Sequence, residues 1–154
     1  MNNKVAILLG SKNDMKFVEA SYKYFDFFNI QVETHIMSAH RNPDNVANFA
    51  KEARKNGYSI LIGAAGMAAH LAGALKANSI LPVIGVPLPG GVSDGMDSLL
   101  STVQMPKGVP VATMSIGKSG FINAAILSAE IIALNNKETI EQLIKFKKMG
   151  AKLY

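Results

Sequence analysis

Short aliphatic runs alternate along the chain with longer segments whose apolar residues recur at helical spacing. Val5–Leu9 is wholly apolar and ends at Gly10, the pattern of a strand buried on both faces. Val18, Tyr22 and Phe25 then fall on one side of a helix. The alternation continues and predicts strands over 5–9, 31–37, 59–64, 82–86 and 111–115, with helices over 15–28, 43–56, 68–77, 97–103, 120–134 and 138–149.

Five strands that alternate with helices predict a parallel α/β sheet with right-handed crossovers. For one domain over residues 1–154, the expected architecture is a flavodoxin-like three-layer αβα sandwich with strand order 2-1-3-4-5. Strand 1 then lies between strands 2 and 3, and ligands bind beyond the carboxyl ends of strands at such a switch point. Residues 10–14, 38–41 and 64–67 meet there, so the sequence predicts a binding site formed by these three segments.

Composition excludes several classes of protein and site. With 49% hydrophobic and 18% charged residues, the chain is too apolar for a disordered segment. The absence of cysteine excludes disulfides, thiolate metal sites and a cysteine nucleophile, and it fits a reducing cytoplasm. The three histidines have no recognised metal-ligand spacing, so no metal centre is expected. The first ten residues lack a signal-peptide core, and polar residues or prolines interrupt residues 56–75 and 77–93, so no membrane span is expected.

The net charge of +5 raises the question of nucleic-acid binding. The basic residues are scattered, apart from Lys145, Lys147, Lys148 and Lys152 near the end of the last predicted helix. No tryptophan is present, and no aromatic residues alternate with the basic ones as a stacking surface requires. Nucleic-acid binding is therefore not expected, and a small anionic ligand accounts for the basicity equally well.

Long stretches with few charges suggest that the chain associates with copies of itself. Residues 56–106 carry charge only on Lys76, Asp94 and Asp97. The long predicted helix that follows carries one charge, Glu130, although an exposed helix normally shows a polar face. Apolar surfaces of this kind usually face another subunit, so an obligate homo-oligomer is expected.

Ser11, Asn13 and Asp14 follow the first strand, and two interpretations of them stay open. They can simply cap the helix that follows. They can also form an anion site, because amide groups and the Ser11 hydroxyl at a helix start favour phosphate. Asp14 would repel phosphate and better suits hydrogen bonds from ribose hydroxyls.

His40 and Arg41 follow a buried strand and precede a predicted helix start at Pro43, a place where packing does not require them. Arg41 fits a bidentate phosphate clamp, and an imidazole exchanges protons near neutral pH. The alternative is a surface ion pair for Arg41 and a solvated His40. His70 lies among small residues, and a core or interface histidine bonded to a carbonyl is as compatible with the sequence as a catalytic one.

Six segments resemble a known family, the PurE family. They are Gly10-Ser-Lys-Asn-Asp14, Ser38-Ala-His-Arg-Asn-Pro-Asp44, Ala68-Ala-His-Leu71, Leu81-Pro-Val-Ile-Gly-Val-Pro87, Asp97-Ser-Leu-Leu-Ser-Thr-Val-Gln-Met-Pro106 and Gly108-Val-Pro-Val-Ala-Thr113. The resemblance spans essentially the whole chain and is strongest to the class I branch. Arg41 and the Val-Gln-Met-Pro segment favour class I, because the class II branch, which carboxylates aminoimidazole ribonucleotide with free carbon dioxide, typically has lysine after the histidine.

The resemblance implies an octamer with active sites shared between subunits and with no metal or organic cofactor. It implies conversion of N5-carboxyaminoimidazole ribonucleotide to 4-carboxyaminoimidazole ribonucleotide in de novo purine synthesis. Functional coupling to the preceding, carboxylating enzyme is left open. Class II carboxylation on the same pocket is the alternative enzyme. A flavodoxin-like binding or signalling module is the alternative of another class, although a receiver domain needs acidic residues that this chain lacks.

The resemblance also implies roles for individual residues. His40 matches the catalytic histidine, Ser11 and Arg41 match phosphate-binding positions, and Asp14 matches a ribose-binding one. The remaining residues expected around the substrate are Asn13, Ser38, Ala39, Ala65, Gly66, Met67, His70 and Leu71. Two of them depart from the family pattern, since members commonly have serine at the position of Asn13 and a second glycine at that of Met67. Met67 should restrict the backbone beside the pocket.

Overall fold

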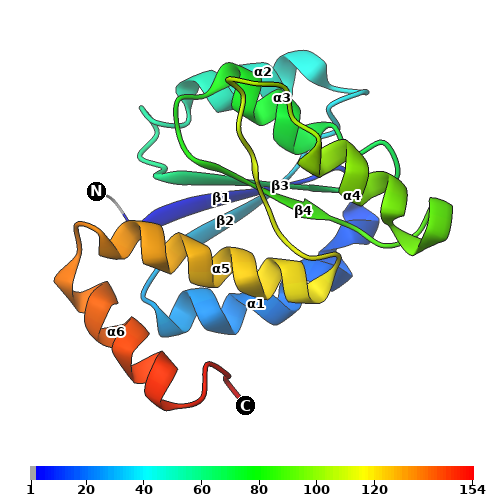
Figure 1. The fold of residues 1–154 in the computed structure, drawn as a ribbon. Helices are drawn as coiled ribbons and strands as arrows, with labels where there is room; N and C mark the ends of the chain where they lie inside the picture. The colour runs from blue at the N-terminus through cyan, green and yellow to red at the C-terminus, as the bar shows by residue number, and fades with distance from the viewer. Residues whose placement is uncertain (1–2) are drawn as a thin grey trace.

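The computed structural model describes residues 3–154 and has one five-stranded parallel sheet at its centre (Figure 1). Its strands are β1 (Lys4–Leu9), β2 (Gln31–Ile36), β3 (Ile60–Ala65), β4 (Val83–Pro87) and β5 (Ala112–Thr113). They lie in the order β2-β1-β3-β4-β5, which confirms the predicted topology. Leu9 of β1 is in register with Ile36 of β2 and with Ala64 of β3, so these three strands end at the same edge.

Helices cover both faces of the sheet (Figure 1). On one face lie α1 (Met15–Phe27) and α5 (Lys118–Ala133), with α6 (Lys137–Lys148) packed on α5. On the other lie α2 (Pro43–Glu52), α3 (Leu71–Asn78) and α4 (Met96–Val103). Two short 3-10 turns, η1 (Lys12–Asp14) and η2 (Val92–Asp94), belong to loops that follow strands. The fold is therefore the expected αβα sandwich.

The side-chain alternation of β1 divides the interior into two cores. Val5, Ile7 and Leu9 point into the core shared with α1, α5 and α6, whereas Ala6 and Leu8 point into the core under α2 and α3. All five side chains are fully buried. A strand buried on both faces has to be apolar throughout, which is why the run of aliphatic residues predicted β1 so well.

Glycine in β3 sets the distance between the sheet and α3. A Cβ at Gly63 would lie 2.8 Å from the Cα of Ala72, closer than side-chain carbons approach backbone atoms. Only glycine therefore lets α3 pack this tightly on the sheet, and this packing positions the β3–α3 loop.

The structure corrects three of the expected boundaries. Helix α2 ends at Glu52, ahead of Gly57, and α3 begins at Leu71 rather than residue 68 because residues 66–70 form the loop beside the site described below. Strand β5 has two residues instead of five, and these pair with Ile84 and Gly85 of β4 at the edge of the sheet.

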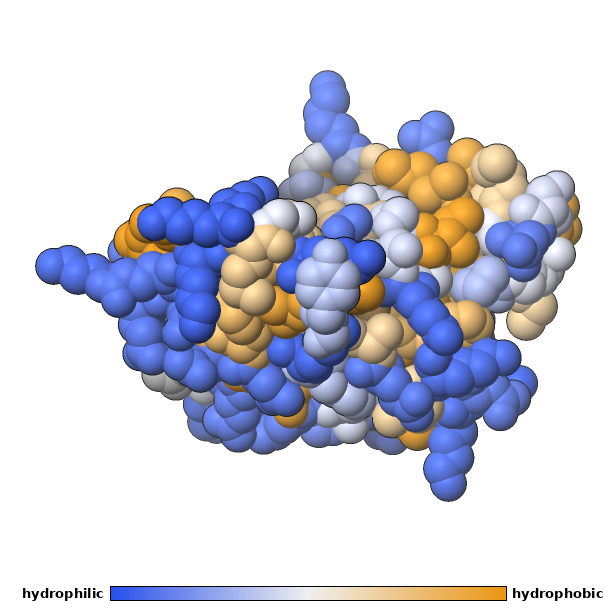
Figure 2. All heavy atoms as spheres, turned by 90° about the horizontal axis from the view of Figure 1, so that it is seen from below, coloured by the Kyte–Doolittle hydropathy of each residue, from blue (hydrophilic) through white to orange (hydrophobic). Residues whose placement is uncertain are grey.

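The apolar character of helix 120–134 is explained in part within the chain itself, and its contact with another subunit stays a prediction. Half of α5 is buried, including Phe121, Ala125 and Ile132, because α1 and α6 of the same chain cover it. The outer face that α1 and α6 present is mostly hydrophilic (Figure 2). Exposed apolar side chains lie on α4, where Met96, Leu100 and Val103 are 46–52% accessible, and also on α6, where Ile140 and Ile144 are 43% and 50% accessible. Among the helices of the described residues, none is long and apolar enough to cross a membrane.

A small polar network ties the edge strand β2 to its neighbours. Glu33 of β2 pairs with Lys4 of β1 at 3.0 Å and accepts a hydrogen bond from the hydroxyl of Tyr58, which precedes β3. The Tyr58 and Lys4 interactions hold the pKa of Glu33 below its ordinary value. Burial, then the hydrogen bond to Glu33 and the negative charge of Glu33, raise the pKa of Tyr58 to about 12.

We expect Glu33→Gln to destabilise the protein at neutral pH and to have less effect in acid. A carboxylate whose pKa is lowered by folding contributes stability above its unfolded pKa, near 4.5, and this contribution is lost as the pH falls through the lower folded value. Urea unfolding between pH 7 and pH 3 measures the difference from the parent protein. Glu52→Gln, which removes an exposed pair to Lys55, is the control and should change little at any pH. A Glu33→Gln difference that is independent of pH would contradict this account.

Candidate active site

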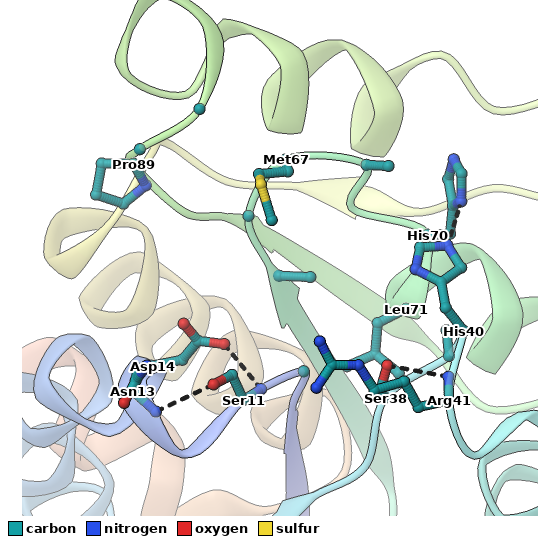
Figure 3. A pocket seen from close by; sticks show the side chains of 17 residues that line it. Ser11, Asn13, Asp14, Ser38, His40, Arg41, Met67, His70, Leu71 and Pro89 are labelled. Carbon is teal, nitrogen blue, oxygen red and sulfur yellow. Dashed lines mark hydrogen bonds between the residues drawn. The ribbon is translucent and has the colours of Figure 1, made fainter.

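A pocket of about 450 Å³ opens at the carboxyl ends of β1, β2 and β3 (Figure 3). This is the switch point at which the sequence predicts a site. All twelve residues expected around the substrate line it: Ser11, Asn13, Asp14, Ser38, Ala39, His40, Arg41, Ala65, Gly66, Met67, His70 and Leu71. The volume is within the usual range for sites that hold a small organic ligand.

The turn after β1 closes on itself through its own polar groups. The backbone N–H of Ser11 donates to Oδ2 of Asp14 at 3.0 Å, and the N–H of Asn13 donates to Oγ of Ser11 at 3.2 Å. These bonds confirm the interpretation that Ser11 and Asp14 cap the helical turn that follows β1, and they use the Ser11 N–H as a donor to Asp14. Anion binding here depends on the Ser11 hydroxyl and the Asn13 side chain, which remain at the pocket wall. Burial raises the pKa of Asp14, and the Ser11 N–H opposes that shift.

The loop after β2 presents Arg41 to the pocket. The Arg41 N–H donates to Oγ of Ser38 at 3.2 Å, which fixes the turn ahead of α2. The side chain then extends across the pocket toward Ser11 (Figure 3). Among residues 3–154 Arg41 makes no ion pair, so the alternative of a surface salt bridge finds no support. The guanidinium is free to bind an anion between the β1 and β2 loops.

His40 is hydrogen-bonded to His70. Their Nε2 and Nδ1 atoms are 2.8 Å apart, and the two rings meet edge to face. Since one ring must donate and the other accept, a single proton lies between them. The side-chain bond of His70 is therefore to His40 and not to a carbonyl. Both rings lie at the edge of the pocket away from Ser11 and Asp14, and Nδ1 of His40 is the ring nitrogen that this bond leaves available (Figure 3).

The loop after β3 contains a strained residue. Met67 has φ +54°, in the left-handed region that glycine tolerates best, and its side chain is 66% exposed. Ser101 of α4 holds the loop, because its hydroxyl oxygen accepts from the Ala69 N–H at 3.0 Å, while its one proton lies closest to the Asp97 carbonyl of α4, at 2.7 Å. Methionine at position 67, where members of the resembled family commonly have a second glycine, therefore costs backbone strain. The loop that carries Met67 nevertheless lines the pocket.

Sequence reasoning missed one wall of the pocket. Its lining also includes Gly10, Ala68, Pro89, Gly90 and Gly91. Pro89–Gly91 follow β4, whose carboxyl end lies at the same edge of the sheet as those of β1 and β3. The rule that predicted the other loops could therefore have found this one. Within residues 3–154 no three histidine or acidic side chains are grouped closely enough to hold a metal ion.

Comparison with known proteins decides the family. The family model described as AIR carboxylase matches residues 4–152. The chain belongs to the AIR carboxylase family. Among proteins named N5-carboxyaminoimidazole ribonucleotide mutase, that of Escherichia coli K12 is 43% identical over 145 residues, covering 94% of this chain and 86% of its own. That of Saccharolobus solfataricus is 46% identical over 143 residues, covering 93% and 89%.

Solved structures agree with this assignment to the AIR carboxylase family. The crystal structure of Treponema denticola PurE superposes with a TM-score of 0.86 at 28% sequence identity, covering 96% of this chain and 91% of that one. The resemblance found in the six sequence segments is thereby confirmed over nearly the whole chain.

We expect Met67→Gly to stabilise the protein by about 0.5–1 kcal/mol, because removing the Cβ relieves more strain than the added flexibility of the unfolded chain costs. Met67→Ala keeps the Cβ and is the matched control, with a change of at most about 0.5 kcal/mol since the methionine side chain is mostly exposed. Urea unfolding at pH 7 measures both variants. Equal effects of glycine and alanine would show that the left-handed backbone is not the source of the strain.

Proposed function

We propose that this member of the AIR carboxylase family is a mutase that converts N5-carboxyaminoimidazole ribonucleotide to 4-carboxyaminoimidazole ribonucleotide in purine biosynthesis. We place this activity in the cytoplasm and assign it no metal or organic cofactor. The observation that carries the proposal is one pocket in which an unpaired arginine and a histidine follow the same strand, β2. The names of relatives 43–46% identical over more than 90% of the chain support the same reaction.

The three loops suit different parts of a nucleotide. Arg41 and the Ser11 hydroxyl approach from opposite sides and would hold the phosphate, with Asn13 beside them (Figure 3). Asp14 accepts hydrogen bonds and suits the ribose hydroxyls. The small residues of the other two loops would line the base and carboxylate: Ser38, Ala39, Ala65, Gly66, Met67 and Leu71.

The reaction needs one carbon–nitrogen bond to break, one carbon–carbon bond to form and one proton to move. The carbamate loses carbon dioxide, and its bonding electrons stay on the aminoimidazole. The nucleophilic C4 of the ring then attacks the trapped carbon dioxide. His40 removes the C4 proton as aromaticity returns, and the net proton transfer is from C4 to the exocyclic nitrogen. A positioned imidazole is suited to this step because it both accepts and returns a proton.

Retaining carbon dioxide requires a pocket closed to water. His40 and Arg41 are exposed in the single chain, so a further surface has to cover them. We assign this cover to a second copy of the chain within a homo-octamer. The exposed apolar residues of α4 support the assignment, since α4 is hydrogen-bonded through Ser101 to the loop that carries Met67.

Carboxylation of aminoimidazole ribonucleotide with free carbon dioxide is the alternative on the same pocket. Isotopically labelled bicarbonate separates the two reactions. With N5-carboxyaminoimidazole ribonucleotide as substrate, we expect product formation with little incorporation of label, and no product from aminoimidazole ribonucleotide and bicarbonate. Product formed only from the second pair of substrates would exclude the mutase and establish the carboxylase.

We expect His40→Asn to lower kcat by roughly 10²–10⁴-fold or more, the usual contribution of a positioned acid–base group. Nucleotide binding and assembly, measured by calorimetry and light scattering, should be retained because His40 is exposed and packs in neither core. His35→Asn is the control, because His35 lies on β2 outside the pocket lining, and it should retain most of the activity. Full activity of His40→Asn would refute the acid–base role.

A further inference from the structure

We propose a second ligand site, for an organic polyphosphate, at the end of the molecule opposite the active pocket. A cavity of about 570 Å³ lies between the end of α2 and the loop that precedes β4. It is lined by Lys51, Arg54, Lys55, Asn78, Ser79 and Ile80. These residues adjoin the amino end of β4, whereas the active pocket lies at the carboxyl ends of the strands, and the two pockets share no lining residue.

Three cations converge on this cavity. Lys51, Arg54 and Lys55 have the i, i+3, i+4 spacing that places side chains on one side of a helix and its final turn. Lys55 pairs with Glu52 at 3.2 Å, but both side chains are exposed, so an anionic ligand can replace that pair at little cost. Lys51 and Arg54 form no ion pair within residues 3–154.

The electrostatic balance favours a ligand with several negative charges. The three positive charges are opposed by one carboxylate, that of Glu52. They are also opposed by the C-terminal dipole of α2, which is equivalent to roughly half a negative charge. The field in the cavity is therefore positive. Arg54 can bind a phosphate through two parallel hydrogen bonds, and the lysines act as point charges toward neighbouring phosphates.

The other wall of the cavity is preformed. The Asn78 amide donates to the Ala74 carbonyl at 2.9 Å, and Nζ of Lys76 donates to the Leu81 carbonyl at 3.1 Å. The Leu81 N–H in turn donates to Oγ of Ser79 at 3.2 Å. These bonds fix the loop with Ile80 76% exposed beside the cations. A fixed apolar side chain next to a cationic cluster suits a ligand with both a flat organic group and phosphates.

The arrangement fits a small molecule better than a protein partner. Stable protein interfaces bury about 800 Å² on each side and have an apolar centre depleted of charge. Here the charges are central and Ile80 is the one apolar side chain of the lining. The cavity volume also falls within the range of small-ligand sites.

Titration calorimetry of the full chain with ATP and with inorganic triphosphate, in the absence of magnesium, tests the proposal. We expect saturable binding of ATP that is weakened about tenfold or more in Lys51→Gln/Arg54→Gln, because two charge-assisted contacts are lost. The control Lys147→Gln/Lys148→Gln removes the same charge from α6 and should stay within about twofold of the parent. Arg41→Ala should retain this ATP binding, which separates the site from the active pocket. Thermal unfolding without ligand verifies that each variant is folded.

Ile80→Ser tests the organic part of the ligand. It should weaken ATP about threefold to tenfold and leave inorganic triphosphate unchanged, since only ATP carries a group that can cover the isoleucine. Lack of saturable ATP binding to the parent chain would overturn the proposal. So would an equal loss in the α6 control, or complete loss of binding in Arg41→Ala. These experiments measure binding constants and not turnover, so their outcome does not depend on whether the chain has the proposed mutase activity.

Discussion

The position of β1 between β2 and β3 is the constraint on which the site depends. Neighbouring parallel strands lie about 4.8 Å apart, so three strands that end in register bring their following loops together. The alignment continues past the strand ends, where the Gly10 N–H donates to the Ala64 carbonyl and the Met37 N–H to the Leu9 carbonyl. Residues 10–14, 38–41 and 65–71, although far apart in sequence, consequently form one pocket.

This constraint explains how much of the structure the sequence could predict. Buried parallel strands must be apolar on both faces, so their positions were clear, and topology then placed the polar residues that follow them. The strand order and the convergence of Ser11, His40 and Met67 on one pocket followed from these two steps. The pattern was less informative for β5, where only two of the five predicted residues pair with β4.

Other features depend on contacts that a one-dimensional pattern does not contain. The apolar character of α5 indicates that something covers it, but not whether the cover is another subunit or, as in this chain, α1 and α6. The bond between His40 and His70 depends on side-chain orientations across two loops. The exposure of Ile80 likewise depends on hydrogen bonds that fix the loop around it.

One residue links the exposed face of α4 to the pocket. Ser101 lies on α4, and its hydroxyl oxygen holds the loop of Met67 by accepting a hydrogen bond from the Ala69 N–H. Leu100 and Val103 lie on the same helix and are about half exposed, with accessibilities of 52% and 46%. A copy of the chain that docks on these side chains would therefore restrict α4 and, through Ser101, the loop at the pocket wall. In the proposed octamer, one contact would thus both cover the apolar face of α4 and order the loop that carries Met67. This gives a physical reason why the reaction site can be buried in the assembly although His40 is exposed in the single chain.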